Sequence, residues 1–286
     1  MDVGEIMKLY FDNPTKSIAI DRVVENLERY MTDDRVHDKA QADLIILHVY
    51  GRHDHVEREV RSIIDSGRQY AIIQYALKST RNPSPKDWKN IWDDAAVVWS
   101  YYELPTPNLY HAPLAASPET FYPTKIKKEF LVGTLGVKEC YESECFGEVH
   151  LAAFQAVGKV VHVGEKLNEN PIVTYYSGLT DEELRQTYNK CKWFATLRRK
   201  EGFEIPAIEA LLCGVRPIMF DTPIYRQWFD GLAKFIPEKD TTKTVKSLRD
   251  LFKGEISRVT PAEIEETKKR FNWEKSIKGF LERCTI

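Results

Sequence analysis

Short apolar runs separated by amphipathic stretches are the feature that most constrains the fold of this 286-residue chain. The runs at 42–51, 70–77 and 95–104 are continuous and rich in Ile, Val, Ala and Tyr. Runs of this kind are typical of strands that are buried on both faces, as in parallel sheets. Because the residues at 18–31 and 56–64 carry apolar side chains at helical spacing, the alternation predicts a doubly wound α/β domain.

A second α/β unit follows a proline-rich stretch at 104–124, which we interpret as the end of the first domain and a linker. Capping patterns at 180–183 and 260–263 indicate two helix starts in this unit. Its predicted strands lie at 127–136, 159–165, 171–179, 192–197, 215–221 and 233–237. The sequence therefore predicts two Rossmann-like domains that face a cleft, with an amphipathic C-terminal helix returning to the first: 1–118, 119–270 and 271–286.

The composition narrows the class of protein. Charged residues make up 29% of the chain and balance to a net charge of −2, so the strongly basic footprint of a nucleic-acid-binding protein is missing. No apolar run reaches the roughly 18 residues of a transmembrane helix, and the first residues lack the pattern of a secretion signal. Five cysteines without a framework spacing fit reduced thiols. We therefore expect a cytoplasmic protein.

The stretch 200–221 carries two acids eight residues apart, Glu201 and Glu209, around an apolar helix. A strand is expected to end near Leu197, so Glu201 lies at its carboxyl end, where ligands bind in open α/β sheets. The helix, starting near Pro206, would present free amides and a partial positive charge to a phosphate. Glu209 could then accept two hydrogen bonds from the hydroxyls of a ribose. The alternative is a solvated loop acid followed by an exposed helix residue.

This stretch resembles the donor-site motif of retaining glycosyltransferases of the GT-B fold, especially family 4, which reads E-G-F-G-x-P-x-x-E-A-x-A-C-G-x-P-V-V. The chain carries Glu201-Gly202-Phe203, Pro206, Glu209-Ala210, Cys213-Gly214 and Pro217. The resemblance extends to the strands and helix before the motif, to the linker HAPLAASPETFYP and to the terminal FNWEKSIKGF. It covers about 105–237 and the C-terminus, and it is only topological in the first 104 residues.

The resemblance implies transfer of a hexosyl or pentosyl group from a UDP-, GDP- or ADP-sugar, with retention of the anomeric configuration and without a cofactor. By the family pattern, Glu209 would bind the donor ribose and Glu201 would act at the sugar hydroxyls. No D-x-D metal motif occurs in the sequence, as expected of a metal-independent enzyme. The further donor contacts that the resemblance implies are at Gly133, Thr134, Gly164, Ser177, Gly202, Phe203, Glu204 and Ile205.

Departures from the family pattern concern the charge on the donor diphosphate. Thr134 stands where the family usually has an arginine, although Lys138 occupies the position of the usual lysine. Two phosphates need more than one lysine, so we expect Arg198 or Arg199 to supply the missing cation, the alternative being a solvated basic loop. Glu204 replaces a glycine of the motif, which bears on the sugar that fits. The missing arginine also supports an alternative function, a degenerate GT-B protein that binds nucleotide or glycan without transfer.

The acceptor is expected to meet loops that follow strands of the first domain, at 13–17, 50–56 and 78–90. Aromatic and cationic side chains in the last loop suit a sugar ring or a phosphate, the alternative being a solvated loop: Lys78, Arg81, Lys86, Trp88, Lys89 and Trp92. We expect a soluble glycan or glycoconjugate as the acceptor, with a modified nucleic acid base as the alternative. We expect no metal site, although two groups contain metal-ligating residue types: His48, His53 and His55, and Cys140, Cys145 and His150.

Overall fold

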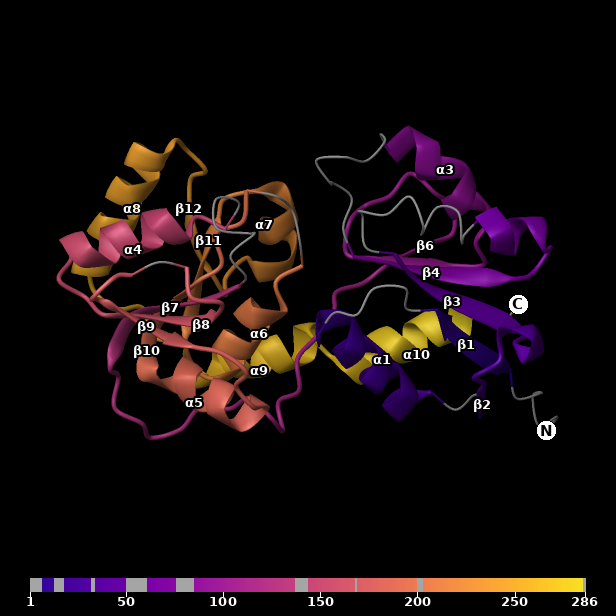
Figure 1. Cartoon of the computed structure of the whole chain (residues 1–286), viewed down its shortest axis with the longest axis horizontal. Helices are drawn as coiled ribbons and strands as arrows, with labels where there is room; N and C mark the ends of the chain where they lie inside the picture. Colours follow the sequence, from indigo (N-terminus) through magenta and orange to yellow (C-terminus); the bar gives the residue numbers. More distant parts are fainter. Residues whose placement is uncertain are drawn as a thin grey trace. The chain divides into compact units, whose positions relative to one another are not determined.

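The chain divides into two compact units (Figure 1). The first comprises Met1–Leu114, Glu201–Phe203 and Asn272–Ile286, and the second comprises Ala115–Lys200 and Glu204–Phe271. The computed structural model describes residues 7–12, 18–31, 34–49, 61–75, 85–136, 144–167, 169–199 and 203–284.

The first unit is built on a six-stranded parallel sheet in the order β2-β1-β3-β4-β5-β6. All residues of β3 and β4 are buried, which confirms the burial on both faces expected from their continuous apolar sequences. The strands are β1 (Lys8–Asp12), β2 (Asp34–Arg35), β3 (Leu44–Val49), β4 (Tyr70–Gln74), β5 (Val98–Ser100) and β6 (Leu109–His111).

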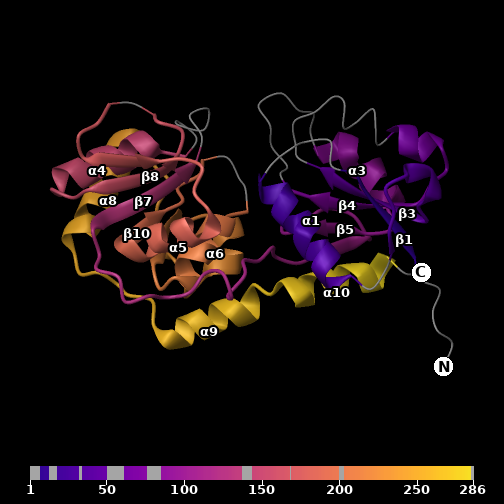
Figure 2. The same ribbon diagram turned by 60° about the horizontal axis from the view of Figure 1, so that its bottom comes forward.

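Helices α1 and α10 lie side by side and contact each other in the first unit (Figure 2). In α10, the Phe280 ring lies 5.4 Å from that of Trp99 in β5, and the Ser276 hydroxyl donates to the carbonyl of Pro113 at 3.0 Å. The terminal helix is therefore part of the first unit. Residues 61–65 are also helical, and the other helices described in this unit are α1 (Ile18–Tyr30), η1 (Lys39–Gln41), α3 (Pro85–Asp94) and α10 (Trp273–Cys284).

One local expectation from the sequence is wrong in this unit, and one strand was not predicted. The stretch 78–90, expected to be a loop, is helical from Pro85 onward, because Ile91 and Trp92 join Trp88 at helical spacing and are buried. The stretch 104–124, interpreted as the end of the first domain and a linker, contains the unpredicted β6, which pairs with β5 in parallel. The residues of β6 are only partly buried, so no continuous apolar run indicated a strand there.

The second unit contains another six-stranded parallel sheet, in the order β12-β11-β10-β7-β8-β9. Counted from the start of the unit, this is the order 3-2-1-4-5-6 of dinucleotide-binding folds, and the prediction of two Rossmann-like α/β sheets is confirmed. The strand order reverses between β7 and β10. The strands are β7 (Phe130–Gly136), β8 (Val160–Gly164), β9 (Val173–Tyr176), β10 (Cys191–Ala195), β11 (Arg216–Phe220) and β12 (Lys234–Ile236).

Helices cover both faces of the second sheet, with α4 and α8 on one face and α5, α6 and α9 on the other (Figure 1). Val149 of α4 and Leu248 of α8 share one core cluster with strand residues such as Trp193. The expected capping boxes at 180–183 and 260–263 are confirmed. The helices are α4 (Phe146–Gln155), α5 (Asp181–Lys190), α6 (Ile205–Leu212), α7 (Pro223–Phe229), α8 (Thr241–Lys253) and α9 (Pro261–Arg270). Among the described residues, no helix is both long enough and apolar enough to cross a membrane.

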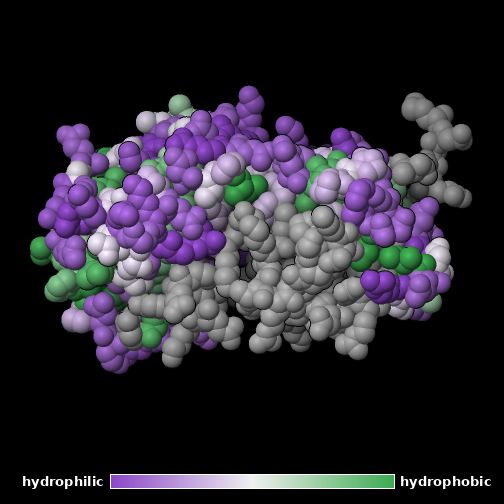
Figure 3. Space-filling view, turned by 90° about the horizontal axis from the view of Figure 1, so that it is seen from above, coloured by the Kyte–Doolittle hydropathy of each residue, from purple (hydrophilic) through white to green (hydrophobic). Residues whose placement is uncertain are grey.

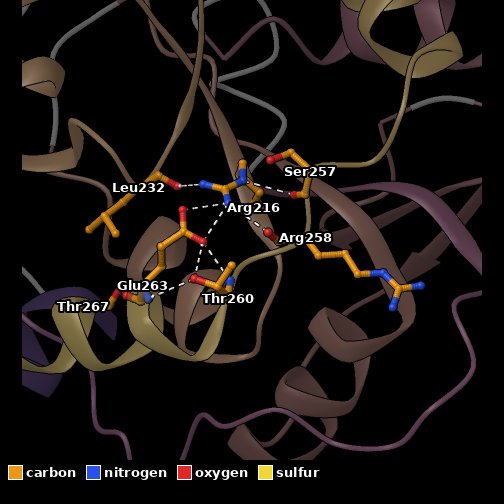
Figure 4. Close-up of polar contacts among 7 residues, drawn as sticks. All are labelled: Arg216, Leu232, Ser257, Arg258, Thr260, Glu263 and Thr267. Atoms are coloured by element: carbon orange, nitrogen blue, oxygen red, sulfur yellow. Dashed lines mark hydrogen bonds and ion pairs between the residues drawn. The ribbon is translucent and has the colours of Figure 1, made fainter.

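The guanidinium of Arg216, in β11, ties several segments of the second unit together (Figure 4). It donates to both carboxylate oxygens of Glu263, at 2.8 and 2.9 Å, and Glu263 accepts in turn from the amide and hydroxyl of Thr260 in the α9 cap. The Arg216 side chain is 9% exposed and that of Glu263 23%, so these bonds are largely shielded from water and hold α9 to the sheet. Arg216 also donates to three carbonyls at 2.9–3.1 Å, those of Leu232, Ser257 and Arg258.

We expect Arg216→Met to lower the free energy of unfolding by about 3 to 5 kcal/mol, because the Glu263 carboxylate and three carbonyls lose their donor. The matched control is Arg226→Met. The Arg226 side chain is 46% exposed in its pairs with Asp221 and Asp230, so a loss of about 1 kcal/mol or less is expected. Urea unfolding measures both losses, and equal losses would contradict the role given to Arg216.

Candidate functional site

Backbone lines the carboxyl ends of β7 and β8 in the second unit. Gly136 ends β7 and Gly164 ends β8, and the two residues are paired in register. A Cβ on Gly164 would lie 2.0 Å from the carbonyl oxygen of Gly136, and its φ is +136°, so only glycine fits. A Cβ on Gly136 would lie 2.5 Å from Oε2 of Glu144. The Glu144 carboxylate therefore lies against the glycine backbone at this edge.

Arg198 lies between two buried carboxylates at the same edge of the sheet. Its guanidinium is 3.0 Å from Oε1 of Glu144 and 2.7 Å from Oε1 of Glu204. Glu144 lies just before α4, Arg198 follows β10 and Glu204 is the N-cap residue of α6. The three residues therefore meet where the strand order reverses, which is where ligands bind in open α/β sheets. With both acids ionised, the cluster carries one excess negative charge.

Burial raises the pKa of Glu204 from its usual 4.5 to about 7. The Arg198 charge opposes this shift, the Glu144 charge adds to it, and a hydrogen bond with Tyr225 also opposes it. A carboxyl group with such a pKa exchanges its proton near neutral pH. Protonation of Glu204 would bring the charge of the three-residue cluster to zero.

Arg199 belongs to a separate network. It donates to the carbonyl of Lys239 at 2.9 Å and to Oε1 of Glu148 at 3.3 Å, and it lies 3.7 Å from Oε1 of Glu238. Its guanidinium also lies 5.4 Å from the centre of the Phe220 ring. Both arginines that were expected to meet a diphosphate are thus paired with acids in this structure. A phosphate contact by either one stays a prediction.

Glu209 is buried on α6, where it is 1% exposed. The hydroxyl of Tyr188, on α5, donates to its Oε2 at 2.7 Å. The Tyr188 ring is held by those of Phe121 and Phe194, with ring centres 6.0 and 4.8 Å away. The alternative that residue 209 is an exposed helix residue is therefore wrong. As expected, α6 has its proline in the first turn.

Gly133 and Thr134 lie inside the sheet. A Cβ on Gly133 would be 2.8 Å from Sγ of Cys191 and 2.9 Å from the Phe194 ring. Thr134 is fully buried, and its hydroxyl lies 2.8 Å from Nδ1 of His162. Burial lowers the pKa of His162 to about 4, so this imidazole is neutral at pH 7. Both positions serve packing here, and a donor contact from either stays a prediction.

The structure also describes three further residues that were expected to contact the donor. Ser177 is exposed directly after β9, whereas Ile205 is buried at the start of α6. Phe203 groups with the first unit. Its backbone amide donates to the hydroxyl of Tyr101 at 2.9 Å, and the two rings lie 4.8 Å apart.

Several residues expected at the site lie outside the described part of the chain. They are Glu201, Gly202 and Lys138, the loops 13–17 and 50–56, Lys78, Arg81, the side chain of Lys86, and the metal candidates His53, His55 and Cys140. Of the expected acceptor residues that are described, Lys89 pairs with Asp93. Trp92 is 1% exposed and donates to Gln74 at 3.2 Å, so the expectation that it stacks on an acceptor is wrong.

The remaining metal candidates are neutral, buried side chains. Burial lowers the pKa of His48 to about 3, and its Nδ1 lies 2.8 Å from the Tyr75 hydroxyl. Burial also raises the pKa of the Cys145 thiol to about 12 and lowers that of His150 to about 4. Within the described ranges, no group of three His, Cys, Asp or Glu could hold a metal ion.

Two residues of the site were missed in the sequence. Tyr188 follows Leu184 by one helical turn, and this apolar spacing could have indicated its burial. Glu144 carries no such signal, because its partner Arg198 reaches it only through the fold of the sheet.

The motif match also needs a correction at one end. Pro217 stands one residue later than the proline of the family pattern, and Arg216 occupies that position.

The raised pKa of Glu204 predicts a pH-dependent stability. Because the folded chain binds the proton more tightly, the contribution of Glu204 is full below about pH 4.5 and is lost as the pH rises through about 7. Glu204→Gln cannot ionise. We therefore expect its free energy of unfolding, relative to that of the wild type, to rise by about 3 kcal/mol across this pH window. Urea unfolding at about pH 5 and pH 8 measures the gain.

The control for this experiment is Glu265→Gln, whose side chain is 70% exposed. Its free energy of unfolding should differ from that of the wild type by the same small amount at both pH values. A pH-independent difference between Glu204→Gln and the wild type would show that Glu204 titrates normally.

Residues 161–278 match the protein family described as Glycosyl transferases group 1. A stretch of 111 residues is 32% identical to "Putative glycosyltransferase 41" of Sulfolobus islandicus filamentous virus (isolate Iceland/Hveragerdi). This stretch makes up 37% of the chain and 32% of the viral protein, so the match spans about a third of that relative.

Solved structures share the fold across almost the whole chain. Anabaena Alr3699/HepE in complex with UDP and glucose has a TM-score of 0.74 at 9% identity, covering 97% of this chain and 98% of that one. Sucrose-phosphate synthase from Thermosynechococcus elongatus has a TM-score of 0.66 at 16% identity, covering 95% and 81%. AviGT4, a glycosyltransferase involved in avilamycin A biosynthesis, has a TM-score of 0.65 at 9% identity, covering 98% and 97%. These likenesses show the GT-B fold, and the family match is confined to residues 161–278.

Proposed function

We propose that the chain is a retaining, metal-independent glycosyltransferase of the family 4 type. It would move a hexosyl or pentosyl group from a nucleotide diphosphate sugar to a glycan or glycoconjugate. The observation that carries the proposal is the place of the motif at 201–217. Its helix, α6, begins where the strand order of a Rossmann-like sheet reverses, inside the stretch that matches Glycosyl transferases group 1.

The proposed diphosphate position is the N-terminus of α6. This terminus would contribute mainly its partial charge of about half a unit, because Pro206 has no N–H and the amides of Ala207 and Ile208 donate to the carbonyl of Glu204. The adjoining edge is lined by the backbone of Gly136 and Gly164. Negative charge grows on the diphosphate oxygens as the sugar leaves. Donors that are already in place therefore lower the barrier to transfer.

Arg198 has to exchange a carboxylate for a phosphate oxygen in this proposal. Glu204 is suited to release it, because a carboxyl with a pKa of about 7 takes up a proton at little cost near neutral pH. Arg198 would then retain its bond to Glu144 while its other edge meets the diphosphate. We propose Lys138 as the second cation, and Arg199 as the alternative to Arg198.

Glu209 is the proposed acceptor for the ribose hydroxyls of the donor. Tyr188 bonds to Oε2 and fixes the rotation of the carboxylate, so the ribose would meet an acceptor that is already oriented. Glu201 would contact the hydroxyls of the transferred sugar. Because the HepE structure contains UDP and glucose, UDP-sugars are the first donors to test, before GDP- and ADP-sugars.

A second candidate function is the binding of nucleotide or glycan without transfer. Two observations favour it. The arginine usual in the family is replaced by the buried Thr134, and both Arg198 and Arg199 are paired with acids. A cation that stays paired with its acids would not stabilise a departing diphosphate, so a bound nucleotide sugar would not be cleaved.

Radiolabelled UDP-, GDP- and ADP-sugars, incubated with the full chain and a metal chelator, test these alternatives. We expect slow release of free sugar from at least one donor. Glu209→Gln should weaken nucleotide binding about tenfold, the typical effect of losing a hydrogen bond to a charged group. Glu201→Ala should chiefly lower the turnover rate, and the exposed Glu265→Gln should change neither. Nucleotide binding without turnover of any donor, with or without glycan acceptors, would favour the second function.

Tyr188→Phe tests the role of the bond to Glu209, because it keeps the ring and removes only the hydroxyl. We expect the KM for the donor to rise about threefold to tenfold, with a smaller change in kcat, since binding is lost equally from the substrate and the transition state. Tyr30→Phe, in α1 of the first unit, is the control. A lower melting temperature with an unchanged KM would restrict Tyr188 to a packing role.

A further inference from the structure

The outer face of α4 and the turn that follows the helix are apolar and exposed. Leu151, Phe154 and Val157 recur at steps of three residues and are 46%, 61% and 96% exposed. The solvent-facing side of a surface helix is usually charged or polar. Gln155 is the neighbouring exposed residue, so no charge lies on this side from Leu151 to Val157. A contiguous apolar surface of this kind commonly marks an interaction site.

Val157 is held in a strained conformation that no packing contact explains. Its φ is +55°, the left-handed region that a β-branched residue seldom adopts. The position just past a helix end normally favours glycine, and the next residue, Gly158, is needed where it is, since a Cβ there would lie 2.1 Å from Leu131. A strained valine that points its side chain into solvent indicates that the exposed side chain itself has a use.

Lysines of α8 lie beside this apolar side. Helices α4 and α8 pack on the same face of the second sheet and share one core cluster, so their outer sides face solvent together. Figure 3 shows hydrophobic surface next to strongly hydrophilic surface at this end of the second unit. The exposed cations of α8 follow one another at steps of three to seven residues: Lys243, Lys246 and Lys253.

Acids neutralise only part of this row. In the row of α8 lysines, Asp240 pairs with Lys243, and the nearby Asp250 pairs with Arg249. Among the described residues, no acid pairs with Lys246 or Lys253, or with the exposed Lys159 that follows α4. The outer side of α4 and α8 therefore combines insertable apolar groups with unpaired positive charge.

We propose that this α4–α8 surface docks on an anionic lipid membrane, with Leu151, Phe154 and Val157 entering the headgroup region and the α8 lysines meeting lipid phosphates. Three apolar side chains cover far less than the roughly 800 Å² that each partner buries in a stable protein complex. On a membrane, each inserted side chain and each lysine contributes separately, so a small mixed surface is sufficient. The proposal does not rest on the proposed transferase function.

Vesicle flotation with the full chain tests the proposal. We expect binding to vesicles that contain phosphatidylglycerol, little binding to pure phosphatidylcholine, and release at high salt. Phe154→Ser should weaken binding about tenfold, because it removes the largest inserted group. Lys246→Glu with Lys253→Glu should weaken it at low salt to a similar extent. Lys269→Glu, on α9 and the opposite face of the sheet, is the matched charge control and should bind like the wild type.

Val157→Gly separates docking from folding. Glycine relieves the left-handed strain, so the melting temperature should rise while vesicle binding falls. Equal binding to neutral and anionic vesicles, or binding that none of these variants changes, would overturn the proposal. So would a concentration-dependent dimer that Phe154→Ser abolishes, since the surface would then join two copies of the chain.

Discussion

The two-pronged hydrogen bond between Arg216 and Glu263 is the interaction on which the second unit depends. A buried ion pair stabilises a fold only when its remaining donors and acceptors are satisfied, and the neighbouring carbonyls and the Thr260 cap meet that condition here. The pair fixes α9 against the sheet, and α9 packs against α6. The helix that carries Glu209 is therefore supported from behind by an ion pair that is not part of the site.

Both arginines that follow β10 are paired with acidic side chains. Each arginine after β10 is held by acids, Arg198 by Glu144 and Glu204, and Arg199 by Glu148 and Glu238. Carboxylate oxygens present to a guanidinium much the same geometry as phosphate oxygens. The acids therefore keep each guanidinium in a bound orientation, at the expense of competing with any anionic ligand. Burial of Glu204 makes this competition depend on pH for Arg198.

Local patterns in the sequence predicted the elements that local chemistry determines. The buried strands β3 and β4, the two capping boxes and the proline at the start of α6 all follow from a few neighbouring residues. Strand β6 was not predicted, because a short, half-buried strand forms only beside β5 and has no continuous apolar run of its own. Helix α3 was not predicted, because the residues around Pro85 are mostly polar and do not show a helical apolar spacing. The ion pairs of Glu144 and of Arg216 form only when segments distant in the sequence meet. The raised pKa of Glu204 likewise depends on its burial in the folded unit. The roles of the expected site residues remain predictions, since Glu201, Gly202 and Lys138 lie outside the described residues.

The packing around Thr134 limits which side chains this position can hold. Its hydroxyl is bonded to His162, whose ring lies 4.8 Å from that of Phe146, and the residue has no exposed surface. An arginine introduced there would have to bury its guanidinium or displace two rings, and both are costly. The core as it is packed around Thr134 therefore excludes an arginine at this position. A cation that meets a ligand at this edge has to come from a less buried segment, such as the one that follows β10.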